Sequence, residues 1–469
     1  MKKVYIYALA YALTAVSCQD NEWGADSATP QAPEIEIPMG AADGELLIKF
    51  VPEMSDILDQ TLTRVGGVAT RSGIPSTDEV LNILGAYHFE RVFPVDPKTE
   101  KRTREAGMHL WYIVRFDKDA DLKEAARQLR KLGEISKIQS NPTLQRAYDP
   151  KKKTLYLSAS DLQHVTRTSE GLTFNDPGLK HQWHYRNAGN YDFVKKDRAE
   201  AIAGADVNCG EAWELCKGDP SIIVAVLDEG VMWSHPDLIA NMWTNEAEEI
   251  GSTEDKDGNG YKGDRYGYNF VKNTGVISWT SADDTGHGTH VAGTIAAENG
   301  NSIGVSGIAG GDGNTGSGVK IMTCQLFDGQ YGATLAAEAK AIKYAADNGA
   351  VVLQCSWGYN SPDANEALGY VPGPKNEQDW ENQYPLEKEA LDYFIHNAGS
   401  PNGVIDGGLA IFASGNEYAP SSSFPAGYSK CISVSAIAAD YTPSSYTNYG
   451  AEITLCAPGG DGDYYGTPG

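Results

Sequence analysis

The stretch Asp284-Thr-Gly-His-Gly-Thr-His-Val-Ala-Gly-Thr-Ile-Ala296 places a histidine, His287, at the mouth of a helix made of small residues. Residues 334–348 form a second predicted helix, with apolar side chains on one face and Gly349 after its end. Continuous apolar runs separated by helices indicate a parallel sheet that is buried on both faces. The sequence therefore predicts an α/β fold, with strands over residues 221–227, 319–327, 350–355, 409–413, 432–437 and 453–457.

Three polar side chains lie at the ends of these predicted elements. Asp228 follows the apolar run 224–227, His287 begins its helix, and Asn416 comes shortly after the run 409–413. In parallel sheets such groups collect at the carboxyl ends of the strands. An acid can fix the tautomer of an imidazole, the imidazole can take a proton from a nucleophile, and an amide can donate to an oxyanion. The three residue types together favour acyl-transfer chemistry.

On these residues the chain resembles the subtilisin-like serine peptidases, or subtilases (peptidase S8 family). The resemblance rests on the stretch 286–296 around His287, on Val226-Leu-Asp-Glu-Gly230, on Ala413-Ser-Gly-Asn416 and on Ala457-Pro-Gly-Gly460. The aspartate precedes the histidine, as in subtilisin. The resemblance covers about residues 182–469 and implies a subtilisin-like parallel sheet flanked by helices.

The resemblance also implies roles for single residues. Asp228 would orient His287, His287 would be the general base and acid, and Asn416 would donate to the oxyanion. Residues 354–358 match the strand that lines the family's substrate cleft. Protein or peptide substrates are therefore expected, with the cleft formed by Ser356, Trp357, Gly358, Ser414 and Gly415.

Two features depart from the family pattern. The nucleophile motif Gly-Thr-Ser-Met-Ala-x-Pro does not occur in the sequence, in which Gly466-Thr-Pro468 repeats only its first two letters. Loss of the nucleophile costs a subtilisin about 10⁶ in turnover. The expectation is a C-terminally incomplete subtilase domain, close to inert as written. The second departure is Glu229, which stands where the family usually has Thr or Ser and adds a carboxylate beside Asp228.

A smaller α+β unit is predicted before this domain, over residues 42–147. Strands are expected over 45–51, 108–116 and 134–139, and helices over 77–84 and 119–132. The basic stretch 98–104 is expected to be a solvated loop. By the resemblance, this unit is a ferredoxin-like inhibitory propeptide, the chain's own intramolecular inhibitor. Residues 148–180 would be a junction and 181–469 the catalytic domain.

The start of the chain indicates export. Lys2 and Lys3 precede a short apolar run, and small residues lead to Cys18. This resembles a bacterial lipoprotein signal, which predicts a signal peptide over 1–17, lipidation of Cys18 and a flexible tether over 18–41. The protein would be lipid-anchored at the outer membrane or cell surface, or else secreted. A membrane is expected to be contacted only through the lipid anchor.

The charge composition excludes one class of partner. The 469 residues carry 38 Lys and Arg against 63 Asp and Glu, a net charge of −25. This excess argues against nucleic acid as a partner, because binding to phosphates rests on basic residues. Cys209 and Cys216 are close enough in sequence for a disulfide, whereas Cys324, Cys355, Cys431 and Cys456 are expected to be buried thiols.

One loop suggests a structural calcium ion. In Asp255-Lys-Asp-Gly-Asn-Gly-Tyr-Lys-Gly-Asp264, oxygen-bearing residues alternate around Gly260. Hard cations take several carboxylate and carbonyl oxygens. The predicted ligands are Asp255, Asp257, Asn259, Tyr261 and Asp264. A solvated acidic turn is the alternative.

Three functions remain open at this point. The first is a serine endopeptidase zymogen without its nucleophile in this sequence. The second is a non-catalytic subtilase-like surface protein that binds peptides or inhibits a partner. The third is a structural calcium-binding surface protein. The segment 361–408 interrupts the strand spacing and is either a rim of the substrate cleft or a plain surface insertion.

Overall fold

The computed structural model describes residues 35–461, apart from residues 36, 39–40, 66–67, 147–171, 190–200 and 400–404. The predicted signal peptide, Cys18 and most of the tether lie outside the described residues, as do much of the predicted junction and Gly466-Thr-Pro468. Within the described part of the chain, no helix combines the length and apolar character that crossing a bilayer requires.

The larger sheet has the order β7-β8-β6-β10-β11-β12-β13, and each of these neighbouring strands runs parallel to the next. Every predicted strand of this domain is present, so the α/β prediction with a parallel sheet is confirmed. The short β9 pairs antiparallel with β8. The bounds are β6 (Ile223–Glu229), β7 (Gly267–Asn269), β8 (Lys320–Asp328), β9 (Tyr331–Gly332), β10 (Val352–Cys355), β11 (Leu409–Ala413), β12 (Ile432–Ile437) and β13 (Leu455–Pro458).

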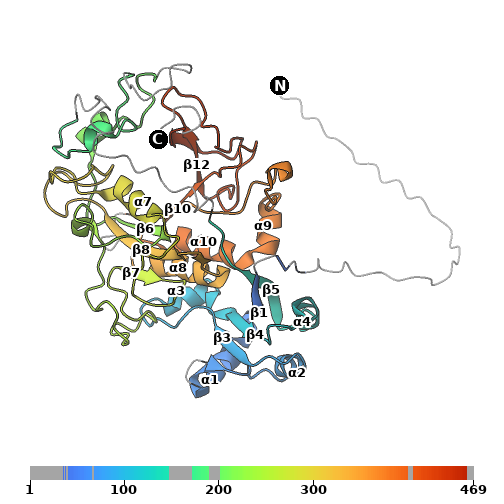
Figure 1. Cartoon of the computed structure of the whole chain (residues 1–469). Coiled ribbons are helices and arrows are strands. Elements are labelled where there is room, and N and C mark those ends of the chain that lie inside the picture. Colours follow the sequence, from blue (N-terminus) through green and yellow to red (C-terminus); the bar gives the residue numbers. More distant parts are fainter. Residues whose placement is uncertain are drawn as a thin grey trace, which may run out of the picture. The chain divides into compact units, whose positions relative to one another are not determined.

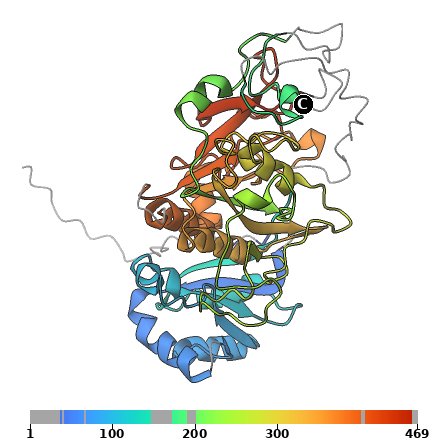
Figure 2. The ribbon, with the colours of Figure 1, turned by 90° about the vertical axis from the view of Figure 1, so that its left-hand side faces the viewer.

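Helices cover both faces of this sheet (Figures 1 and 2). On one face α7 (His287–Ala296) packs Ala292 and Ala296 against Val224 and Val226 of β6. On the other face α8 (Leu335–Asp347) and α10 (Pro385–Asn397) enclose the larger apolar core. The other helices of this domain among the described residues are η3 (Leu179–His181), α6 (Cys209–Leu215), η4 (Ile239–Asn241), η5 (Glu366–Leu368) and α9 (Glu377–Gln383).

The N-terminal unit is an antiparallel sheet with the order β2-β3-β4-β1-β5. Without the two-residue β2, this is the strand order and connectivity of a ferredoxin-like fold. The predicted α+β unit is therefore present. Its elements are β1 (Ala41–Phe50), η1 (Pro52–Met54), α1 (Ser55–Val65), β2 (Val68–Ala69), α2 (Pro75–Ile83), β3 (His88–Arg91), α3 (Glu100–Glu105), η2 (Met108–Leu110), β4 (Trp111–Arg115), α4 (Leu122–Leu129) and β5 (Ile135–Pro142).

Side-chain alternation along these strands divides them between two cores. On β4, Tyr112 and Val114 face the helices of the unit's own core, whereas Trp111 and Ile113 join the core of the large domain. On β1, Leu46 and Ile48 take the first side and Leu47 the second. The N-terminal sheet is thus buried on both faces, and its second face packs against the large domain.

Strand β5 uses the same alternation to bind the ends of two helices. The Gln139 side-chain oxygen accepts the N–H of Leu386 in the first turn of α10 at 2.8 Å, and the Asn141 oxygen accepts the N–H of Ala336 in the first turn of α8 at 3.0 Å. Lys137, on the same face, pairs with Glu389 of α10 at 2.9 Å. Helix N-termini have unsatisfied N–H groups, so these side chains supply capping acceptors from a different domain. Figure 1 shows β1 and β5 beside α8 and α10.

Two sequence-based expectations are wrong here. The basic stretch 98–104 was expected to be a solvated loop, but most of it forms α3, whose Arg102 pairs with Asp347 of α8 at 2.8 Å. Cys456 is exposed rather than buried, because β13 lies at the edge of the sheet as described. Cys209 and Cys216 are both free thiols in the structure, so the small disulfide loop is not formed.

A pair of acidic side chains lies inside the interface between α8 and α10. Glu338 and Glu387 are both fully buried. Burial raises the pKa of Glu387 from 4.5 to about 7, although hydrogen bonds from Trp380 and Tyr359 oppose the rise. Burial and the charge of Glu387 raise the pKa of Glu338 well above its ordinary value. Folding therefore takes up protons as these two carboxyls become buried.

This pair predicts a pH-dependent stability. Because both pKa values rise on folding, the contribution of the pair is complete below about pH 4.5 and is lost as the pH rises through about 7. Glu338→Gln replaces one of the two titrating carboxyls by a neutral amide, so the variant should lose less stability than wild type as the pH rises. The free energy of unfolding of the variant relative to wild type should increase by about 1–3 kcal/mol between about pH 5 and pH 8. Thermal denaturation at a series of pH values measures this. The exposed Glu53→Gln should show a pH-independent difference, and an E338Q difference that is equally flat would contradict the prediction.

Candidate active site

The carboxyl end of β6 presents two acidic side chains in the interior. Every residue of β6 is buried, and Asp228 and Glu229 are each 1% exposed. The Asp228 carboxylate accepts the N–H of Glu229 at 2.6 Å. Gly230 follows at a point where a Cβ atom would lie 1.9 Å from the carbonyl oxygen of Ser278. Only glycine therefore fits directly after the strand. The strand itself ends with two carboxylates, those of Asp228 and Glu229.

Helix α7 begins directly against this strand end. Gly286 precedes it with φ of +80°, a conformation that favours glycine. A Cβ on Gly288 would lie 2.2 Å from the carbonyl oxygen of Glu229, so only glycine allows the helix to approach β6 this closely. The Glu229 carboxylate accepts the N–H groups of Gly286 and His287 at 3.0 and 3.1 Å. Glu229 thus caps α7, and a negative charge at this position interacts favourably with the positive end of the helix dipole.

This packing brings His287 to Asp228. The Nδ1 atom of His287 lies 2.8 and 2.9 Å from the two Asp228 carboxylate oxygens. Burial lowers the pKa of His287, but the hydrogen bond and charge of Asp228, together with the charge of Glu229, outweigh it and raise the pKa above its ordinary 6.5. A carboxylate held at Nδ1 keeps the proton there and leaves Nε2 able to accept one. The predicted pair therefore has the geometry of an oriented general base.

The third predicted group lies in the same cavity. Asn416 follows β11 and is exposed, and it lines the cavity that His287 also lines. Ser414 and Gly415 connect it to the strand. Ser414 is buried with its N–H on the carbonyl of Val434, and Gly415 has φ of +114° with no space for a Cβ beside Asn448. These contacts fix the turn that carries Asn416.

The predicted cleft strand after β10 forms another wall. Ser356, Trp357 and Gly358 all line the cavity. The Trp357 ring is buried against Phe412 at 5.3 Å, so most of this side chain supports the wall rather than facing solvent. Residues 371–375 of the segment predicted as a rim also line it. The cavity has a volume of about 1940 Å³, larger than the ~300–1,000 Å³ typical of small-molecule pockets, and suits an extended chain.

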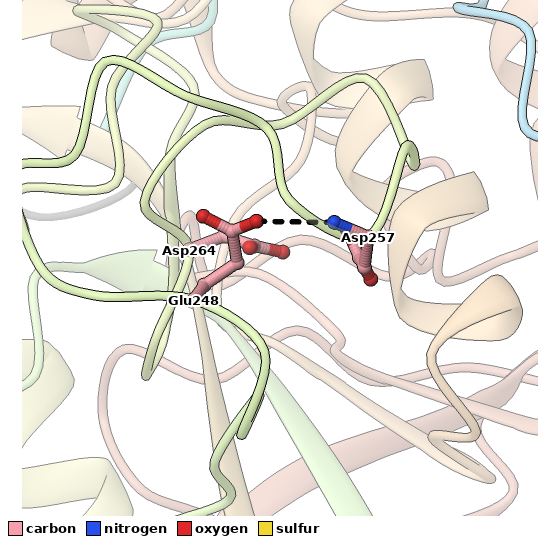
Figure 3. Close-up of side chains that lie close together, drawn as sticks. All are labelled: Glu248, Asp257 and Asp264. Atoms are coloured by element: carbon pink, nitrogen blue, oxygen red, sulfur yellow. Dashed lines mark hydrogen bonds between the residues drawn. The ribbon is translucent and has the colours of Figure 1, made fainter.

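The acidic loop gathers only part of its predicted ligand set. Carboxylate oxygens of Asp257, Asp264 and Glu248 lie within 4.8 Å of one another (Figure 3). Asn259 is adjacent, with its side-chain amide donating to Asp264 at 3.0 Å. Burial first, and then the charge of Asp257, raise the pKa of Asp264 to about 6, although hydrogen bonds from Tyr344, Asn259 and Asn245 oppose the rise. This acidic cluster could bind a metal ion.

Asp255 and Tyr261, the other two predicted ligands, make further contacts in that loop. The Asp255 carboxylate accepts the N–H groups of Gly258 and Gly260, both at 2.8 Å, and so fixes the turn. The Tyr261 ring is buried among other aromatic rings, 4.9 Å from Tyr344. Glu248 was not predicted, because it stands outside the alternating pattern and only the folded loop brings it close.

A further residue that sequence reasoning did not find is Arg146. It follows β5 in the N-terminal unit, yet its guanidinium reaches Glu229 at 3.0 Å. Only 8% of its side chain is exposed. The departure of Glu229 from the family pattern was visible in the sequence, but nothing there connected it with Arg146.

Comparison with known proteins agrees with this geometry. A family model described as the subtilase family (Peptidase_S8) matches residues 219–468. Halolysin of Haloferax mediterranei is 33% identical over 257 residues, which are 55% of this chain and 38% of halolysin. The halolysin-like extracellular serine protease Nep of Natrialba magadii is 30% identical over 262 residues, 56% of this chain and 38% of Nep.

The chain is also similar to solved structures. The serine protease of Aeromonas sobria is 23% identical with a TM-score of 0.44, covering 68% of this chain and 47% of that chain. The chain spans 38% of the length of each of the two curated relatives above.

The Asp228–His287 contact makes a direct prediction. Asp228→Asn removes the charge that raises the pKa of His287, so burial should then dominate and the pKa should fall below 6.5. Titration of the His287 imidazole by NMR measures this. The exposed Asp117→Asn is the matched control and should leave the titration unchanged. A His287 pKa that does not move in D228N would show that the two side chains are not paired in solution.

Proposed function

The chain belongs to the subtilase family, and from this premise we propose that it is a serine-type endopeptidase zymogen that hydrolyses peptide bonds by acyl transfer. The observation that carries the proposal is the 2.8 Å contact between Nδ1 of His287 and Asp228, in a cavity that Asn416 shares. In this proposal His287 takes the proton of the nucleophile through Nε2 and returns it to the leaving amine. Asp228 holds the tautomer and stabilises the imidazolium, and Asn416 donates to the oxyanion.

Substrate peptides would lie along the cavity walls in extended form. The proposed wall residues are Ser356, Trp357 and Gly358 on one side and Ser414 and Gly415 beneath Asn416. Backbone edges of this kind bind an extended chain by strand addition, largely independent of sequence. Protein and peptide substrates are therefore the proposed class.

The N-terminal unit is proposed to be the intramolecular inhibitor. Leu144 donates its N–H to the carbonyl of Ala333 at 2.8 Å, and Thr143 forms an antiparallel bridge with Thr334. Residues 142–146 line the cavity together with His287. In this proposal the chain after β5 lies in the cavity that a substrate would enter, and it would block the cleft until it is removed.

The second candidate is a non-catalytic subtilase-like protein that binds peptides or inhibits a partner at the surface. The Gly-Thr-Ser-Met-Ala-x-Pro motif does not occur in residues 1–469, and this candidate would apply if the motif is also absent from the whole protein. In either case export is proposed from the N-terminal sequence, with Cys18 as the lipidated residue. The printed name of Nep, an extracellular protease, is consistent with export.

A calcium ion is proposed at the acidic loop. Asp257, Asp264 and Glu248 would hold it, with Asn259 beside them, because three clustered carboxylates suit a hard cation and because burial raises the pKa of Asp264. Asp255 would stabilise the loop without binding the ion. The ion's contribution would be structural, since the loop lies apart from the cavity residues.

A fluorophosphonate probe distinguishes the two candidate functions. We expect the 469-residue chain to remain unlabelled, because the Gly-Thr-Ser-Met motif does not occur in it, and labelling of this chain would contradict that expectation. The protein isolated from its natural source should be labelled if an in-frame Gly-Thr-Ser-Met follows codon 469. Labelling and peptide hydrolysis should then fall by at least about 10³ in His287→Ala. A stop at codon 469 together with an unlabelled protein would favour the non-catalytic candidate.

Calcium binding predicts a chelator-sensitive stability. An ion that binds only the folded state stabilises it by about 2.7 kcal/mol at a hundredfold excess over Kd. Removing calcium with a chelator should therefore lower Tm by several degrees, and Asp257→Asn should abolish most of that difference. Asp312→Asn, in an exposed acidic turn elsewhere, is the control and should keep it. Equal Tm values with and without calcium in the wild-type chain would exclude the site.

A further inference from the structure

A buried arginine from the N-terminal unit ends beside the Asp228–His287 pair. Arg146 places Nη1 3.0 Å from the Glu229 carboxylate and Nη2 3.4 Å from the Asp284 carboxylate. The same guanidinium donates to the carbonyl of Asp283 at 2.8 Å and to the carbonyl of Gly329. It also lies 5.8 Å from the centre of the Phe327 ring. These groups, Glu229, Asp284, the two carbonyls and the Phe327 ring, are called the Glu229 pocket below.

The Glu229 pocket is held in place by the large domain. Glu229 accepts N–H groups from Thr285, Gly286 and His287, all at the start of α7. Asp284 accepts the N–H of Gly329 at 2.7 Å and that of Ser281 at 2.9 Å. Both carboxylates are therefore held in position by bonds that do not involve Arg146. A preorganised pair of buried carboxylates next to two carbonyls has the geometry of a receptor for a planar cation.

Arg146 follows a short segment that pairs antiparallel with the large domain. Thr143 and Leu144 pair with the backbone at Thr334 and Ala333, and Arg146 follows two residues later in the same cavity as His287. Recognition by strand addition takes affinity from the backbone and specificity from pockets for side chains. A basic side chain that follows such a strand beside the imidazole can reach the Glu229 pocket whichever chain supplies it.

We propose that the Glu229 pocket is a specificity subsite for a basic side chain, arginine above lysine, in the peptide that binds this cleft, and that Arg146 occupies it as the inhibitory unit's own anchor. The proposal rests on the proposed peptidase function for the substrate, but its anchor role stands on the contacts alone. Arginine is preferred because its two terminal nitrogens reach both carboxylates at once, whereas an ammonium acts as a point charge.

Local structure alone does not explain a glutamate at position 229. Capping α7 needs only an acceptor, which Ser or Thr also provides. A buried carboxylate costs desolvation energy that an ion pair only partly offsets, so such pairs are poor stabilising devices. They discriminate well, because a neutral occupant leaves the carboxylates without their partner. A selective site is therefore the better account of this residue.

Chemical rescue tests the anchor role in the whole chain. Arg146→Ala vacates the pocket and should lower Tm. Propylguanidinium should then raise the Tm of R146A in a saturable way by several degrees and leave wild type unchanged. Propylurea, a neutral analogue of similar shape, should have no such effect. Equal responses to the two compounds, or an equal response of R146A and wild type, would overturn the proposal.

Paired variants assign any rescue to this pocket. R146A/E229Q and R146A/D284N should each lose the response to propylguanidinium, with the second variant available should the loss of the α7 cap unfold the first. Arg127→Ala is the matched control, since Arg127 lies in the same unit but pairs with Glu124 on the surface. R127A should show no saturable response. A rescue that persists in both double variants would place the bound cation elsewhere and overturn the proposal.

The substrate preference is measured with peptides in an enzymatically active preparation. Replacing arginine by citrulline at each position before the cleaved bond should lower kcat/KM by at least about tenfold at one position only. Glu229→Gln should reduce that ratio toward one. Cleavage without any arginine preference would refute the subsite while leaving the peptidase function intact. If the protein from its natural source is inactive while the 469-residue chain still shows the rescue, the peptidase function is refuted and the anchor stays in place.

Discussion

The close contact between the end of β6 and the start of α7 is the constraint on which the site depends. Gly288 has no Cβ, so the helix meets the backbone of Glu229 directly, and His287 in the first turn reaches Asp228 at 2.8 Å. Any larger residue at 288 would push the imidazole away from the carboxylate. The same contact lets Glu229 cap the helix, so one strand end both orients the imidazole and supplies the neighbouring negative charge. The chemistry of the cavity follows from this single approach of a helix to a strand.

The N-terminal unit supplies hydrogen-bond acceptors to the N-termini of two helices of the large domain. Helices α8 and α10 begin with N–H groups that need acceptors, and Gln139 and Asn141 provide them from one face of β5. Glu389 near the start of α10 in turn receives Lys49 and Lys137. Because these acceptors belong to a different unit, the first turns of both helices are fully satisfied only when that unit is docked. Contacts of this kind are what the proposed inhibitory unit would need if it also assisted folding.

Most of the fold and the Asp228–His287 pair could be predicted from local sequence. The residues that could not be predicted depend on contacts between distant parts of the chain. Asp228, His287 and Asn416 could be predicted because each follows a strongly apolar strand or opens a helix of small residues. Glu248 and Arg146 could not, because their partners are distant in sequence and no periodicity connects them. Tyr261 matched the alternating oxygen pattern of the loop, but its ring gains more from burial among aromatic side chains. The polar composition of the stretch 98–104 predicts a loop. The stretch instead forms most of α3, because Arg102 pairs with Asp347, which is distant in sequence.

Glu229 shows how one residue can join structure and recognition without conflict. Its carboxylate receives three backbone N–H groups, so its position does not depend on a bound cation. A pocket whose shape depended on its occupant would rearrange once the occupant left, and would lose its selectivity. Here the carboxylate lies at the positive end of the α7 dipole and close to His287, where its charge also raises the pKa of the imidazole. Departure of the Arg146 guanidinium removes a positive charge that opposes this rise, so emptying the cleft and strengthening the base are consequences of the same step.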